Sequence, residues 1–105
     1  MIKKLLFIFF ISISSLSFSQ SSINDLSASP NPFSDRTIIR FQSSANQDTF
    51  ITIKNILGKT VYRGYLNARK GKNSFPFEKG DLKPGIYIYA VQSNKDFISK
   101  RFVIK

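Results

Sequence analysis

Alternating apolar and polar residues are the feature that most constrains how this chain folds. From residue 23 to residue 104, short runs with a period of two follow one another, and Gly, Pro, Asn and Asp punctuate them. No stretch keeps apolar residues at the i, i+3, i+4 and i+7 spacing of an amphipathic helix. The sequence therefore predicts short strands joined by turns.

Seven strands are expected, and two of them carry positional information. The strands span residues 23–29, 37–42, 49–55, 59–67, 73–77, 86–92 and 97–104. Pro76 has no N–H to donate, so its strand should lie at a sheet edge. The run from Ile86 to Gln92 is apolar on both faces, which predicts a central strand. Seven such strands favour an all-β, seven-stranded antiparallel immunoglobulin-like β-sandwich, with a small open barrel as the alternative.

The N-terminal segment, residues 1–19, has the three-part pattern of a cleavable signal peptide. Lys3 and Lys4 precede an apolar run, and small residues stand before a cleavage point between Ser19 and Gln20. The run is too short and too rich in serine to span a bilayer, so no transmembrane segment is expected after cleavage. We therefore expect a signal peptide over 1–19 and one β-sandwich domain over 20–105.

Composition excludes several classes of function. The chain has 105 residues with no His, Cys or Trp, and 16 Lys+Arg against 6 Asp+Glu give a net charge of +10. Without His and Cys there is no zinc or iron–sulfur site of the usual kind, no Cys–His nucleophile pair and no disulfide framework. The sequence thus predicts a non-enzymatic protein with no catalytic residues, no metal and no cofactor. A secreted domain of this size without disulfides also points to a bacterial source.

The basic residues form two groups along the sequence. One contains Arg63, Arg69, Lys70 and Lys72, and the other contains Lys100, Arg101 and Lys105. They predict either a solvated surface in which Lys protects the sheet edges, or attraction to an acidic partner such as an outer-membrane receptor or anionic lipopolysaccharide. Nucleic acid is not an expected partner, because no recognition helix or base-stacking motif is apparent.

Five short motifs occur in a distinctive order. They are Pro30-Asn31-Pro32-Phe33, then Thr37-x-Ile39-x-Phe41, then Asn55-Ile56-Leu57-Gly58-Lys59-Thr60-Val61, then Leu82-Lys83-Pro84-Gly85-Ile86-Tyr87, and last Lys100-Arg101-Phe102-Val103-Ile104-Lys105. Gly58 should supply the positive φ of a hairpin turn, and Pro84 and Gly85 the centre of a type II turn. Together the motifs resemble the C-terminal sorting domain of proteins that the type IX secretion system of the Bacteroidetes exports.

The resemblance implies a non-catalytic address that the outer-membrane secretion machinery recognises as a folded domain. It implies a secreted or cell-surface protein that passes through the periplasm, and possible removal of the domain by a sortase-like C-terminal signal peptidase. The sorting motif positions that carry over are Pro30, Asn31, Pro32, Gly58, Val61, Leu82, Gly85, Tyr87, Lys100 and Lys105. Deleting residues 101–105 is expected to abolish export.

In one respect the sequence departs from the family pattern. The domain normally follows a large cargo, whereas here the predicted signal peptide leads directly into it, so no cargo is expected. This departure keeps a second class of function open, namely a stand-alone immunoglobulin-like module that binds a surface glycan or protein. Such a glycan site would need exposed aromatic residues on one sheet face, and Tyr62 and Tyr65 are the candidates. Direct binding to an anionic membrane is a third possibility.

Overall fold

A computed structural model describes residues 22–105, and the predicted signal peptide and its cleavage point between Ser19 and Gln20 lie outside the described residues. Seven strands make up the domain: β1 (Ile23–Ser29), β2 (Arg36–Ser43), β3 (Gln47–Asn55), β4 (Thr60–Ala68), β5 (Gly71–Glu78), β6 (Gly85–Gln92) and β7 (Phe97–Ile104). Each predicted strand is present, and the bounds differ by at most two residues. Within residues 22–105, no helix has the length and apolar character needed to cross a bilayer.

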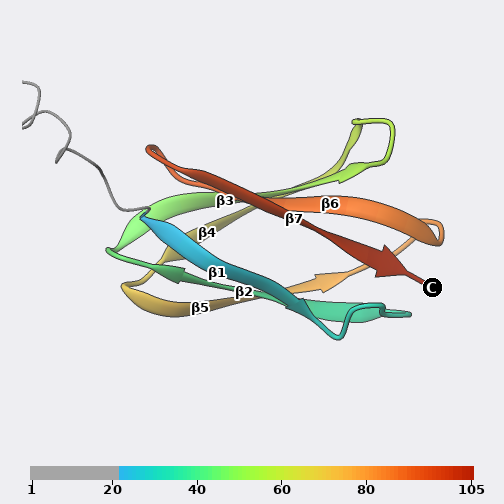
Figure 1. Cartoon of the computed structure of the whole chain (residues 1–105), viewed down its shortest axis with the longest axis horizontal. Coiled ribbons are helices and arrows are strands. Elements are labelled where there is room, and N and C mark those ends of the chain that lie inside the picture. The colour runs from blue at the N-terminus through green and yellow to red at the C-terminus, as the bar shows by residue number, and fades with distance from the viewer. Residues whose placement is uncertain (1–21) are drawn as a thin grey trace, which may run out of the picture.

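The strands form two antiparallel sheets that pack face to face (Figure 1). One sheet has three strands in the order β1-β2-β5, and the other has four in the order β4-β3-β6-β7. Because β4 pairs with β3, the fourth strand lies in the sheet opposite to the one it joins in a constant-type immunoglobulin domain. The predicted immunoglobulin-like sandwich is confirmed, and two separate sheets replace the alternative of an open barrel.

Alternation along each strand builds the core between the sheets. In β3, Ile51 and Ile53 are fully buried while Phe50 and Lys54 face outward. Aromatic rings fill the centre of the sandwich, where Phe102 stacks on Tyr89 with ring centroids 5.0 Å apart. Within residues 22–105 every buried side-chain nitrogen and oxygen has a hydrogen-bond partner; the Thr49 hydroxyl, for example, donates to the Leu66 carbonyl at 2.6 Å. The period-two pattern thus corresponds to inward and outward faces, with an exception in β6, where Tyr89, Ala90 and Val91 are all buried.

The positions of β5 and β6 in the sheets are as predicted, but one face of β6 is open. Pro76 lies in β5, an edge strand that pairs only with β2. β6 lies between β3 and β7, as its apolar sequence predicts. However, Ile86 and Ile88 are exposed on its outer face, because nothing within residues 22–105 forms a third layer over the four-stranded sheet. The predicted central position of this strand is therefore confirmed, although two isoleucines of its outer face are exposed.

Candidate functional site

The Pro-Asn-Pro segment lies along the free edge of the last strand. Val103 N donates to Asn31 Oδ1 at 2.9 Å, and Asn31 Nδ2 donates to the Arg101 carbonyl at 3.3 Å. Two residues after Asn31, Phe33 N donates to the Val103 carbonyl at 3.0 Å, and Lys105 N donates to the Phe33 carbonyl at 2.9 Å. The other edge of β7 pairs with β6. Its C-terminal half is therefore held on both sides, although the two segments are about 70 residues apart in sequence.

Two further contacts hold the Pro-Asn-Pro segment and Phe33 against the rest of the domain. The Phe33 side chain is fully buried and packs edge-on against Phe102, with ring centroids 5.0 Å apart. The Thr37 hydroxyl donates to the Pro30 carbonyl at 2.7 Å. Pro30, Asn31 and Pro32 themselves stay exposed. The sequence thus buries one phenylalanine and displays the three residues before it.

The Lys83-Pro84-Gly85 connection is closed by a tyrosine hydroxyl. Tyr87 Oη donates to the Lys83 carbonyl at 2.7 Å, and Leu82 packs partly buried against the core. Gly85 has φ +154° and pairs with Ile104 as the first residue of β6. The predicted type II turn is therefore wrong, since its third residue would have φ near about +80°.

The β3–β4 hairpin follows the turn chemistry that the sequence predicts. Asn55 Oδ1 accepts hydrogen bonds from Leu57 N and Lys59 N, both at 3.0 Å. Gly58 N donates to the Asn55 carbonyl at 2.9 Å, and Gly58 has φ +89°. The Asn55 side chain, which accepts hydrogen bonds from its own turn, and Gly58 in the left-handed region are enough to stabilise this hairpin turn.

These four segments meet at one end of the sandwich. Asn55 pairs with Tyr87, Gly85 pairs with Ile104, and Phe33 bridges to Ile104. In Figure 1 this end lies on the right, beside the label of the C-terminus. We call the surface made by residues 30–33, 55–59, 82–87 and 101–105 the motif end.

Residues 27–105 match the family described as the secretion system C-terminal sorting domain. The match includes all the segments of the motif end. The chain belongs to this sorting-domain family. Membership confirms the resemblance to type IX sorting domains, and it implies a protein exported across the outer membrane to the cell surface or the medium.

None of the curated proteins matches the chain. Among solved structures, the chain is similar to the crystal structure of the C-terminal domain of wzt, with a TM-score of 0.43 and 13% sequence identity, over 82% of this chain and 71% of that chain.

The sorting domain brings together all the motif positions named from the sequence except one. The motif end contains Pro30, Asn31, Pro32, Gly58, Leu82, Gly85, Tyr87 and Lys105, with Val61 partly buried just behind it. Lys100 lies apart, opposite Tyr89 in the middle of β7. Sequence reasoning missed Phe33 as the anchor, and it also missed Ile56 and Leu57 at the hairpin tip. Two adjacent apolar residues inside a turn were the signal for the latter.

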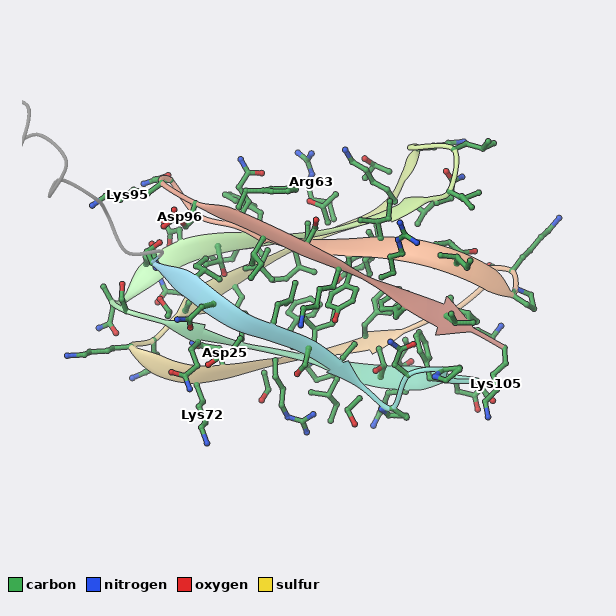
Figure 2. The ribbon with its side chains drawn as sticks, viewed as in Figure 1. Asp25, Arg63, Lys72, Lys95, Asp96 and Lys105 are labelled. Atoms are coloured by element: carbon green, nitrogen blue, oxygen red, sulfur yellow. The ribbon has the colours of Figure 1, made fainter. Side chains whose placement is uncertain are left out.

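The two basic groups do not form two patches. Arg63 projects from the outer face of the four-stranded sheet, whereas Lys72 projects from the three-stranded sheet on the opposite side (Figure 2). Lys100 and Arg101 are neighbours in a strand, so their side chains point to opposite faces of the sheet. The prediction of two basic groups from sequence position was therefore wrong, because residues that are close in the sequence lie on different faces of the domain.

The end opposite the motif end contains Asp96, at the turn between β6 and β7. Hydrogen bonding from the Ser22 side chain, and then from its backbone, lowers the pKa of Asp96; Ser22 N lies 2.6 Å from Asp96 Oδ2. This contact ties the start of the domain to the β6–β7 turn. Within the core, burial raises the pKa of the Tyr89 hydroxyl, which keeps it neutral.

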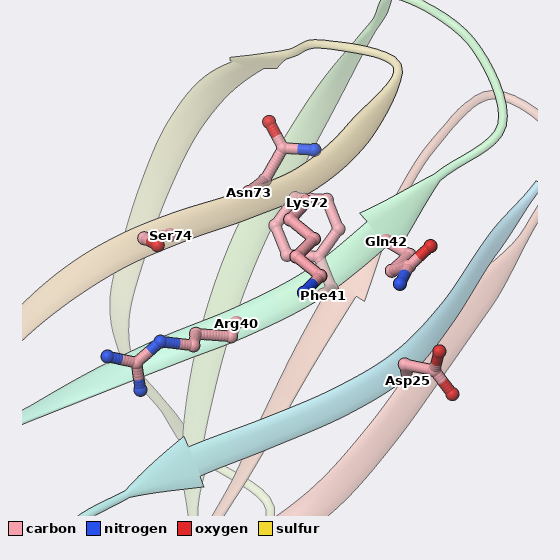
Figure 3. Close-up of a pocket in the computed structure, with 7 residues that line it drawn as sticks. All are labelled: Asp25, Arg40, Phe41, Gln42, Lys72, Asn73 and Ser74. Carbon is pink, nitrogen blue, oxygen red and sulfur yellow. The ribbon is translucent and has the colours of Figure 1, made fainter.

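A shallow hollow on the outer side of the three-stranded sheet is lined mainly by charged and polar residues. Figure 3 shows Asp25 of β1, Arg40 of β2 and Lys72 of β5 around it, with the ring of Phe41 at its floor. Asp25 has φ +54° where the β1–β2 register shifts, which indicates a bulge at the sheet edge. Bulges and charges of this kind protect an edge strand from pairing with other chains, and this role accounts for the residues present.

Proposed function

We propose that this domain is a non-catalytic export signal, which the outer-membrane machinery of the type IX secretion system recognises as a folded unit at the motif end. The observation that supports this most is the contact between Asn31 and β7. Because the Pro-Asn-Pro segment holds the final strand, the first and last sorting motifs form one surface only in the folded domain. An unfolded tail would present the two motifs separately.

Insertion of a fluorescent reporter after Ser21 of the full chain tests this proposal. In a Bacteroidetes host, the intact reporter chain should reach the cell surface or the medium. The same chain without residues 27–105 should keep its reporter in the periplasm. Equal distribution of the two chains would overturn the proposal. Removing only residues 101–105, the deletion suggested by the sequence, is a poorer test because it takes Phe102 and Ile104 out of the core.

The proposal extends to processing before and after export. Cleavage between Ser19 and Gln20 would release residues 20–105, whose net charge is +8 once Lys3 and Lys4 are gone. A sortase-like peptidase and anionic lipopolysaccharide are the further partners that we propose. The excess of cations supports the second of these, because it favours contact with an anionic surface. Mass spectrometry of the exported reporter would show both cleavage points.

A second candidate function is a binding module for a surface glycan. Tyr62 faces the core side of its sheet, where it is partly buried against Phe77, so it does not share a sheet face with Tyr65. Tyr65 is exposed beside Phe50 on the outer face of the four-stranded sheet, with ring centroids 5.7 Å apart. Asp48 accepts a hydrogen bond from the Tyr65 hydroxyl at 2.6 Å and holds that ring in place. Binding of the purified protein to surface polysaccharide, lost in Tyr65→Ala, would support this candidate.

A further inference from the structure

The tip of the β3–β4 hairpin exposes two apolar side chains that the turn does not need. Ile56 is 72% exposed and Leu57 is 89% exposed. The turn is held by the Asn55 side chain and by the positive φ of Gly58, and the tip contributes only backbone groups. Ser, Asn or Lys at the tip would satisfy the same geometry. The apolar character of the tip therefore calls for an explanation outside the fold.

Two isoleucines of β6 continue this apolar surface. Ile86 is 44% exposed and Ile88 is 36% exposed on the outer face of the four-stranded sheet. Together with Ile56 and Arg101 they line a hollow between the hairpin and the sheet. We call Ile56, Leu57, Ile86, Ile88, Lys54 and Arg101 the tip-and-shelf patch. The patch overlaps the motif end, since Ile56, Leu57, Ile86 and Arg101 belong to both.

The charge of this patch has one sign. Lys54 and Arg101 lie directly opposite Ile88 on its two neighbouring strands. Within residues 22–105, the ion pair that forms joins Arg36 to Glu78, so neither cation has a carboxylate partner. No acidic residue lines the hollow. An apolar hollow with the unpaired Arg101 in its wall, and with Lys54 opposite Ile88 on the neighbouring strand, is complementary to an apolar side chain flanked by carboxylates.

We propose that the tip-and-shelf patch is the docking surface through which the sorting domain binds a protein of the export machinery. This proposal rests on the export function proposed above. The partner surface would be acidic and would insert an apolar side chain between Ile56 and Ile88. A protein suits the patch better than a bilayer does, because the hollow is concave and needs a protruding occupant. The exposed Leu57 would in turn enter a pocket of the partner, as a docking anchor does.

Single substitutions in the reporter chain test this surface. Leu57→Ser and Ile88→Thr should each lower the exported fraction at least tenfold, because each removes apolar area that the partner would bury. Arg101→Glu should do the same by placing a negative charge opposite the acidic partner. Phe50→Ser and Lys72→Glu are the matched controls, since both residues are exposed and neither lines a hollow with a residue of the patch. Both controls should be exported like the unchanged chain.

The outcomes separate this inference from the export function. Failure of the unchanged reporter chain to leave the periplasm would contradict the export function itself. Export of the unchanged chain together with equal export of Leu57→Ser would overturn the docking surface alone. Thermal melting of purified Leu57→Ser should match that of the parent, which excludes a folding defect.

Two other occupants of the patch would also be detected. Binding of the purified protein to phosphatidylglycerol vesicles that Leu57→Ser abolishes would replace the protein partner with a lipid surface. A dimer in sedimentation that Leu57→Ser dissociates would replace it with a second copy of this chain. Either result would overturn the proposal.

Discussion

Replacing Asn31 with alanine removes both side-chain hydrogen bonds that join the Pro-Asn-Pro segment to β7. These bonds run to Val103 N at 2.9 Å and to the Arg101 carbonyl at 3.3 Å. A hydrogen bond of this kind contributes about 0.5–1.5 kcal/mol net, and both are solvent-exposed, so we expect a total loss of about 1–2 kcal/mol. For a domain of this size, that loss lowers the melting temperature by roughly 4–16 °C.

Thermal unfolding of the purified protein, followed by circular dichroism, measures the global effect. Hydrogen exchange then locates it, because the Val103 amide loses its acceptor and should exchange at least about tenfold faster. Asn24→Ala is the matched control, since Asn24 is an exposed asparagine of β1 whose side chain makes no hydrogen bond within residues 22–105. A melting temperature for Asn31→Ala within one degree of the control, with unchanged Val103 protection, would refute the reasoning.

Three further predictions concern stability. Phe33→Ala should cost about 3–5 kcal/mol in chemical denaturation, because the buried ring contacts Phe102 at the centre of the core; a loss below 1 kcal/mol would contradict this packing. Gly58→Ala should destabilise by roughly 1–2 kcal/mol through its φ of +89° alone, since its Cβ would meet nothing within 4 Å, and Gly58→Asn should recover part of the loss. The lowered pKa of Asp96 means that its contribution to stability is present above its ordinary value of 3.8 and is lost as the pH falls through the lower folded-state value. Asp96→Asn should therefore melt below the parent at pH 7 and converge with it in acid; a constant gap across pH 2–7 would contradict the assignment.

Local chemistry made the strands predictable. The missing N–H of Pro76 placed β5 at an edge, and the apolar run of β6 placed it at the centre of a sheet. In both cases the chemistry of the strand's own residues determines its position in the sheet. The turn at Asn55 was predictable for the same reason, since one side chain and one glycine make it.

Contacts over long sequence distances were not predictable from local pattern. Nothing around residue 31 shows that its side chain will meet the backbone of Val103, because that contact depends on how two sheets pack. The same limit applies to the outer face of β6. Whether Ile86 and Ile88 are covered depends on the existence of a third layer, which the strand sequence does not encode.

Closeness in the sequence also gave a wrong prediction for residues within a strand, where successive side chains alternate between the two faces. Lys100 and Arg101 look like one basic group in the sequence, yet adjacent residues of a strand face opposite ways. The result is that Arg101 joins Lys54 around Ile88 from another strand, while Lys100 does not. The register of the strands therefore determines which residues meet at the candidate site, and that register is known only from the folded structure.

The central claim is that this folded domain is an export signal for the type IX system. The most direct test compares the full chain carrying the reporter in an export-competent Bacteroidetes strain and in the same strain without the secretion system. Our account predicts surface or extracellular reporter in the first strain and periplasmic reporter in the second. Periplasmic reporter in both strains, with the domain folded and resistant to protease, would contradict it.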